Sequence, residues 1–137
     1  MIEYRTGKSG LDLDAVIELY DASTLGERRP VHDRARMAAM LEHANLVVTA
    51  WERDLLVGIS RSFSDFAYVT YLSDLAVRAS HQRCGIGREL IRITRRESGP
   101  RTYIVLLAAP KAVDYYPRIG FSRHDSAWVL RAEDALR

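Results

Sequence analysis

Residues 82–87 read QRCGIG, with two glycines separated by one residue. An apolar strand-like segment ending at Arg78 precedes them, and a helical pattern that includes Leu90 and Ile91 follows. A helix that begins in this way presents unpaired backbone N–H groups at its start, where the helix dipole adds partial positive charge. Glycine also lets a phosphate come close to the backbone, because it has no Cβ. The stretch therefore predicts an anion-binding turn, although a plain strand-to-helix turn explains these residues alone equally well.

The residues around this turn exclude two other phosphate-binding motifs. A dinucleotide-binding fingerprint requires a third glycine where Leu90 stands, and an acidic residue near the end of the next strand, where Ala108–Ala109 stand. A P-loop requires Gly-Lys followed by Ser or Thr, which the turn lacks. Three arginines close to the turn in sequence, Arg78, Arg83 and Arg88, could neutralise a bound anion.

The hydrophobic pattern outward from the turn predicts one α/β domain over residues 1–137. We expect a mixed central sheet of about six to seven strands flanked by helices, with a βαβ unit around the turn. The continuous apolar run 104–109 is typical of a strand buried on both faces. The expected strands are 2–5, 46–51, 55–63, 68–78, 104–109, 121–124 and 127–131, and the expected helices begin near 13, 37, 85 and 112.

Composition limits the possible partners and compartments. The chain has 137 residues, 47% of them hydrophobic, and a net charge of only +2, so we expect neither nucleic acid nor a membrane as a partner. The single cysteine, Cys84, cannot form an internal disulfide, and the N-terminus lacks a signal-peptide pattern. We therefore expect a cytoplasmic protein. The four histidines show no ligand spacing, so no metal site is expected.

Three segments together resemble the GNAT acetyltransferase superfamily. Gln82-x-x-Gly85-x-Gly87 matches its Gln/Arg-x-x-Gly-x-Gly/Ala signature, residues 72–77 resemble its fourth strand, and residues 112–121 resemble its Ala-x-x-x-Tyr-x-x-x-Gly-Phe segment. The resemblance implies acetyl-CoA as co-substrate, with the pantetheine arm between two splayed strands and the pyrophosphate at the turn. The implied cofactor-binding residues are Leu75, Ala76, Val77, Gln82, Arg83, Cys84, Gly85, Ile86, Gly87, Arg88 and Tyr116. Ala108-Ala109-Pro110 departs from the family, where many members place an Asn after the fifth strand.

The resemblance also implies catalytic residues. Tyr116 occupies the position of the family's general acid, with Tyr115 as the alternative, and a phenol can protonate a departing thiolate. Tyr116 could instead only pack its ring on the sheet. Asp74 lies where an acceptor amine would bind in this fold, and could take or hold its proton. A structural role is equally consistent, because an unperturbed Asp is a poor base.

The expected reaction is direct acetyl transfer to a primary amine of a small molecule or peptide, because no nucleophile with an adjacent base is evident. A catalytically silent acyl-CoA-binding module that serves as a sensor or controls a partner is the alternative. The sequence does not identify the acceptor, and a homodimer is possible.

Overall fold

The computed structural model describes all 137 residues, and the chain divides into two compact units, Met1–Leu107 and Ala108–Arg137. The first unit is a mixed α/β fold that contains the whole sheet. Its elements are β1 (Glu3–Thr6), α1 (Leu13–Ala22), η1 (Thr24–Arg28), α2 (Arg34–His43), β2 (Leu46–Glu52), β3 (Leu55–Ser64), β4 (Val69–Val77), η2 (Ala79–His81), α3 (Ile86–Ser98) and β5 (Tyr103–Val105). The second unit contains η3 (Pro110–Ala112) and α4 (Tyr115–Arg118).

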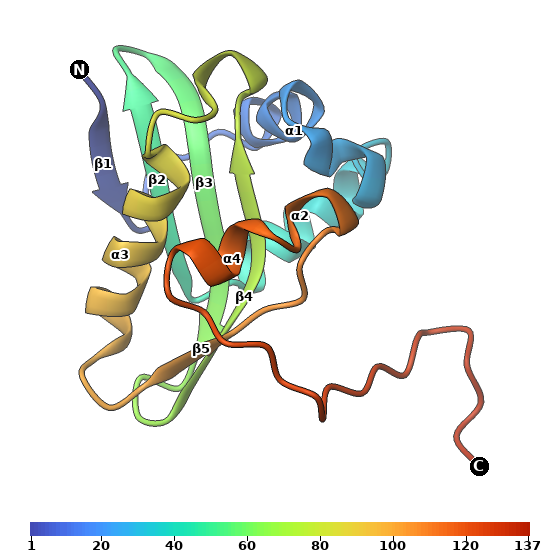
Figure 1. Cartoon of the computed structure of the whole chain (residues 1–137). Coiled ribbons are helices and arrows are strands. Elements are labelled where there is room, and N and C mark those ends of the chain that lie inside the picture. The colour runs from blue at the N-terminus through green and yellow to red at the C-terminus, as the bar shows by residue number, and fades with distance from the viewer. The chain divides into compact units, whose positions relative to one another are not determined.

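The sheet has the strand order β1-β2-β3-β4-β5 (Figure 1). The first three pairings are antiparallel, whereas β4 and β5 are parallel and are connected through α3. This arrangement confirms the βαβ unit around the glycine turn. None of the helices has the length and apolar character needed to cross a membrane.

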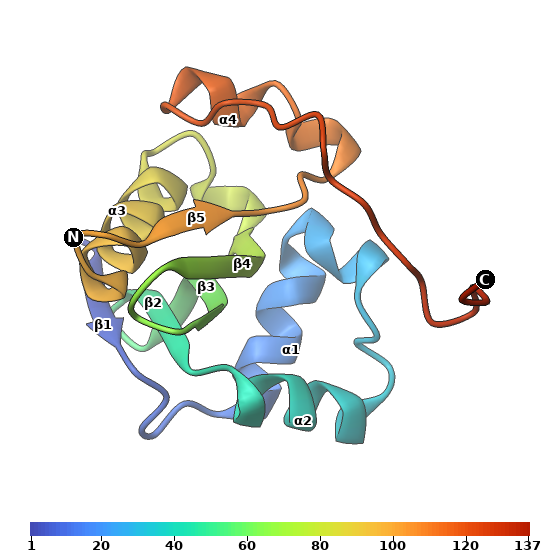
Figure 2. The same cartoon turned by 90° about the horizontal axis from the view of Figure 1, so that it is seen from below.

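The two faces of the sheet carry different helices, α1 and α2 on one and α3 on the other (Figure 2). On α1, the Asp12 carboxylate accepts from the Ala15 N–H and starts the helix, which buries Leu19 and Tyr20 completely. On α3, apolar residues at i, i+4 and i+7 pack on β2 and β3, and each fully buried aliphatic side chain contributes about 1.5–3 kcal/mol. These α3 residues are Ile86, Leu90 and Ile93.

A bulge in β4 changes which of its residues point to each face of the sheet. Leu72 lies opposite Ser62 and Asp74 opposite Arg61, so Ser73 has no residue opposite it on β3. Before the bulge, the Thr70 hydroxyl contacts Ser98 of α3; after it, the Asp74 carboxylate contacts Tyr20 of α1. The sequence predicts Leu72, Asp74 and Ala76 on one face. That is wrong for Leu72, because the extra residue moves the following side chains to the other face.

The sheet has five strands rather than six or seven, and β5 is shorter than expected. Strand β5 ends at Val105, and both Tyr103 and Val105 are exposed, so the run 104–109 is not a strand buried on both faces. It is the last strand of the sheet and has a neighbour on one side only. Residues 121–131 form no strand, because the Ala108–Arg137 unit offers no third strand and an isolated two-stranded hairpin is marginal in water.

Candidate functional site

Strand β4 has a free edge over most of its length. Strand β5 pairs only with Val69–Tyr71, and β4 continues to Val77 without a partner on that side. The Arg78 N–H donates to the Val57 carbonyl of β3, so the backbone groups one and three residues earlier, at Val77 and Leu75, point away from β3. On the free edge of β4, the N–H and carbonyl of Leu75 and the N–H of Val77 therefore have no backbone partner.

The glycine turn follows directly after this edge. Arg83 and Gly85 both have left-handed backbone conformations, with φ of 63° and 82°. Gly85 caps α3 without a side-chain hydrogen bond, so no side chain occupies the first N–H groups of the helix. A Cβ at Gly85 would meet no heavy atom within 4 Å, which leaves open space above the turn. The turn has the room and the donors that a phosphate requires.

The side chains of the turn take different positions. Gln82 donates from Nε2 to the Val77 carbonyl at 3.0 Å and fixes the turn to the end of β4. Ile86 is the first residue of α3 and its side chain is buried against the sheet, so only its backbone can bind a ligand. Arg83, Cys84 and Arg88 are exposed, whereas Arg78 forms a two-point pair with Glu18 of α1 at 2.8 Å. Two of the three arginines near the turn are thus free of a carboxylate partner.

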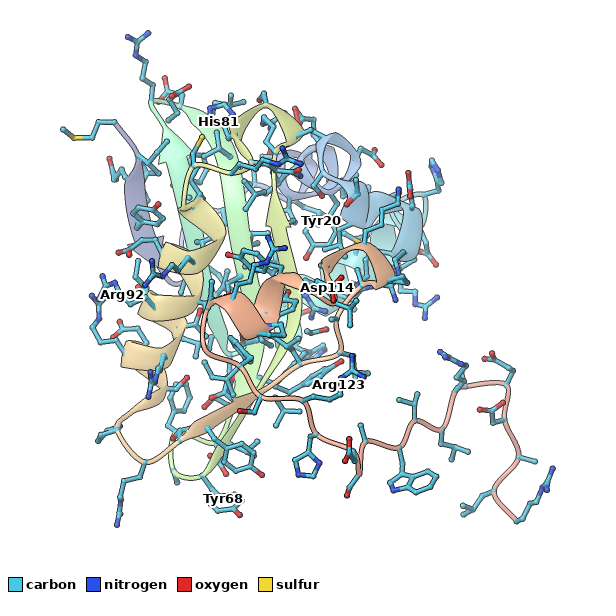
Figure 3. All side chains as sticks on the ribbon, viewed as in Figure 1. Tyr20, Tyr68, His81, Arg92, Asp114 and Arg123 are labelled. Carbon is cyan, nitrogen blue, oxygen red and sulfur yellow. The ribbon has the colours of Figure 1, made fainter.

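Asp74 lies in a buried charged cluster made by four side chains from different elements. Its Oδ2 accepts hydrogen bonds from the Tyr20 hydroxyl and from Arg61 Nε, and its Oδ1 accepts from Arg29 Nε, each at 2.6 Å. Ser73 supplies further acceptors, because its Oγ binds Arg61 Nη2 and its carbonyl binds Arg29 Nη2. Figure 3 shows the Tyr20 side chain pointing from α1 toward the sheet.

The ionisation of this cluster follows from its geometry. Burial raises the pKa of Asp74, but the hydrogen bond and charge of Arg61 outweigh it and leave the pKa below its usual value. Burial and the Asp74 charge raise the pKa of Tyr20, so its phenol stays protonated. Asp74 is therefore an anion with its oxygens occupied, and this arrangement favours the structural role over that of a proton acceptor.

The site residues Tyr115 and Tyr116 lie in the Ala108–Arg137 unit, on α4. Gly120 has φ of 109°, and this turn lets the Phe121 N–H bond back to the Tyr116 carbonyl at 3.1 Å. The Phe121 ring then packs edge-on against the Tyr116 ring, with the two ring centroids 5.3 Å apart. This contact explains the Tyr-x-x-x-Gly-Phe spacing. Burial and the neighbouring Tyr115 raise the pKa of Tyr116, so its phenol is protonated at neutral pH.

The sequence analysis missed Arg29, Arg61 and Tyr20 as partners of Asp74. They lie 45, 13 and 54 residues from it in the chain, so no local spacing connects them. One signal was present, because Arg61 is a charged residue inside the apolar strand pattern 55–63. No three His, Cys, Asp or Glu side chains come together in a way that could hold a metal ion.

Comparisons with known proteins agree with this fold. A family model for the acetyltransferase (GNAT) domain matches residues 19–130. A Deinococcus radiodurans protein assigned as an acetyltransferase superposes with a TM-score of 0.76 at 23% identity, covering 95% of this chain and 88% of that one. Aminoglycoside N-acetyltransferase AAC(6')-Iy, solved with CoA, superposes with a TM-score of 0.73 at 16% identity, covering 97% of this chain and 95% of that one. An aminoglycoside acetyltransferase from an uncultured soil metagenomic sample, solved with sisomicin, gives 0.70 at 21% identity, covering 99% and 97%.

Proposed function

Because this chain belongs to the GNAT acetyltransferase family, we propose that it transfers an acetyl group from acetyl-CoA directly to a primary amine of a small molecule or peptide. The family model spans residues from both compact units, which supports one functional domain over residues 1–137. The unpaired Cys84 supports a reducing compartment such as the cytoplasm.

The observation that carries this proposal is the succession of a free strand edge and a glycine turn. The free N–H and carbonyl of Leu75 and the free N–H of Val77 suit the amides of a pantetheine arm, which pair with a strand edge as another strand would. Ala76 lies between them and packs its side chain into the core on the α1 face. The turn at Gln82–Arg88 then suits the pyrophosphate, with backbone N–H groups at the start of α3 as donors and Arg83 and Arg88 as nearby cations.

Acetyl-CoA supplies a thioester whose carbonyl the amine attacks. In our proposal, the unpaired N–H groups of the β4 edge stabilise the negative charge that develops on the carbonyl oxygen. Tyr116 donates a proton to the departing thiolate, and its raised pKa keeps the acid form available. The proton that the amine nitrogen loses as the amide forms restores the phenol, directly or through water. Asp74 acts as a positioning residue, because it holds α1, β3 and the residue after η1 around the bulge.

The relatives support a small-molecule acceptor. Two of the superposed proteins are named as aminoglycoside acetyltransferases, and one of them was solved with sisomicin. At 16% and 21% identity they share a fold with this chain, so the shared chemistry is the amine rather than the particular molecule.

Release of free CoA from acetyl-CoA, measured against a panel of primary amines, tests the proposal. An N-acetyltransferase releases thiol only when a suitable amine is present, and mass spectrometry then finds the acetylated amine. The alternative, a catalytically silent acyl-CoA-binding module, would bind acetyl-CoA but release no thiol with any amine. A chain that failed to bind acetyl-CoA at all would contradict both functions.

A further inference from the structure

The charged cluster around Asp74 carries one more positive than negative charge. Asp74 is an anion, Arg29 and Arg61 are cations, and Tyr20 is neutral. Neither guanidinium bonds to a second carboxylate. A net charge that is partly removed from water is unfavourable unless an anion comes to it.

Arg29 is the member of the cluster that can reach a ligand. The Arg61 side chain is 6% exposed, whereas the Arg29 side chain is 22% exposed. Of the five N–H donors of a guanidinium, Arg29 uses three, for Asp74 Oδ1, the Ser73 carbonyl and the Arg28 carbonyl. Two donors remain on the more exposed of the two guanidiniums.

Arg29 is also close to the place where the acetyl group would lie. Its Nη2 is 2.9 Å from the Ser73 carbonyl, on the part of β4 that has no β5 partner. Leu75 follows two residues later, and two residues along a strand span about 6–7 Å. An anion bound to Arg29 and an amine beside the Leu75 edge would thus be separated by the length of one small molecule.

We propose that Arg29 binds a carboxylate of the acceptor, so that the preferred acceptor class is a small amino acid or a similar amino-carboxylic acid. The inference rests on the proposed acetyltransferase function and narrows its acceptor. A guanidinium pairs with a carboxylate through charge-assisted hydrogen bonds, which are roughly twice as strong as neutral ones. The same surplus charge opposes a polycation, so an aminoglycoside such as sisomicin is a poor acceptor for this chain.

The test compares L-amino acids with their own carboxamides as acceptors. The two differ in the carboxylate, and rates are expressed per concentration of neutral amine to remove the difference in amine pKa. We expect kcat/KM to favour the acid by about 10- to 100-fold, as for a hydrogen bond between charged groups. Equal use of both forms by the wild-type protein, or a preference for sisomicin, would overturn the proposal whatever the variants do.

Two substitutions locate the effect. Arg29→Gln should bring the ratio of kcat/KM for the acid to kcat/KM for the carboxamide close to one, mainly by raising KM for the acid. Arg29→Lys should keep part of the preference for the acid. Arg28→Gln is the matched control, because Arg28 is the exposed neighbour and only Arg29 and Arg61 form ion pairs with Asp74. The ratio of acid to carboxamide should be unchanged in Arg28→Gln. A preference that survives Arg29→Gln assigns the carboxylate to another residue and overturns the proposal.

A binding measurement separates this proposal from the acetyltransferase function itself. Calorimetry with CoA present detects amino-acid binding even without turnover, and loss of that binding in Arg29→Gln supports the carboxylate site. Thiol release with neutral amines but no acid preference would refute the carboxylate site alone. Absence of CoA binding would refute the acetyltransferase function instead.

Discussion

The Tyr20 hydroxyl of α1 donates a 2.6 Å hydrogen bond to Asp74 Oδ2 of β4, across 54 residues of chain. Both side chains are buried, and the same carboxylate oxygen also accepts from Arg61 Nε. The bond fixes the first long helix to the strand whose free edge we assign to acetyl-CoA. Stability and the shape of the site therefore depend on one carboxylate.

Asp74→Asn should destabilise the fold strongly. The change keeps the size of the side chain but leaves Arg29 and Arg61 without their anion, and breaking a buried ion pair in this way costs about 3–5 kcal/mol. Urea unfolding measures the loss, and Glu89→Gln, which breaks the exposed pair with Arg92, is a control with a small effect. A variant that unfolds like the wild type but has lost its rate would show that Asp74 acts in the chemistry.

The contribution of Asp74 to the free energy of unfolding should be lost at low pH. Its pKa is lowered in the folded chain, so the unfolded chain binds the proton more readily. The stabilisation is therefore complete above the ordinary Asp pKa of about 3.9 and is lost as pH falls below it. The difference in unfolding free energy between wild type and Asp74→Asn should be constant near neutral pH and shrink below about pH 4. A difference that shrinks near neutral pH would contradict this ionisation.

Gly85→Ala should weaken CoA binding as well as the fold. Gly85 has φ of 82°, where an alanine costs about 1–2 kcal/mol, and its added methyl group enters the open space above the turn. Gly10 has φ of 71° and equally open surroundings, so Gly10→Ala is a control with similar strain at another loop. If CoA binds as proposed, it should stabilise the wild type by about 2.7 kcal/mol at a hundredfold excess over Kd. Thermal unfolding should show this gain in Gly10→Ala and a smaller one in Gly85→Ala; equal gains would exclude the turn as the phosphate site.

Tyr116→Phe should reduce kcat by about 10²- to 10⁴-fold while CoA binding is retained, because only the proton donor is removed. The Phe121 ring contact does not involve the hydroxyl and should survive. Tyr115→Phe is the companion variant and should keep most of the rate, since Tyr116 has the motif spacing to Gly120-Phe121. If Tyr115→Phe is the inactive variant, the assignment of the acid must move by one residue; if both stay active, the proton comes from elsewhere.

Local patterns were sufficient to predict most of the first unit. The hairpin between β2 and β3 and the helix after the turn follow from periodicity and glycine position, because each is decided by neighbours in sequence. Residues 121–131 show the limit of that reasoning. Their alternating pattern predicts strands, but a strand also needs a partner, and pairing is not a local property.

The candidate site was predictable in part for the same reason. The glycine turn, Asp74 and Tyr116 were identified from their motifs, which are contiguous. The partners of Asp74 were not identified, because an ion pair between residues distant in the chain produces no local sequence pattern. Without those partners, Asp74 was interpreted as a possible base. The structure shows that its carboxylate forms ion pairs with two guanidiniums.

Ser73, the bulge residue with no partner opposite it on β3, is a position where the chain could lose one residue. If Ser73 were deleted, β4 would alternate without interruption, with Leu72 still facing α3 and Asp74 still facing α1. Neither hydrophobic core needs this residue, so a one-residue deletion would leave both layers intact. It would remove only the carbonyl and hydroxyl that Arg29 and Arg61 bind. Insertion and deletion at this position thus offer a way to reshape the surface that we propose for the acceptor without changing the fold of the sheet.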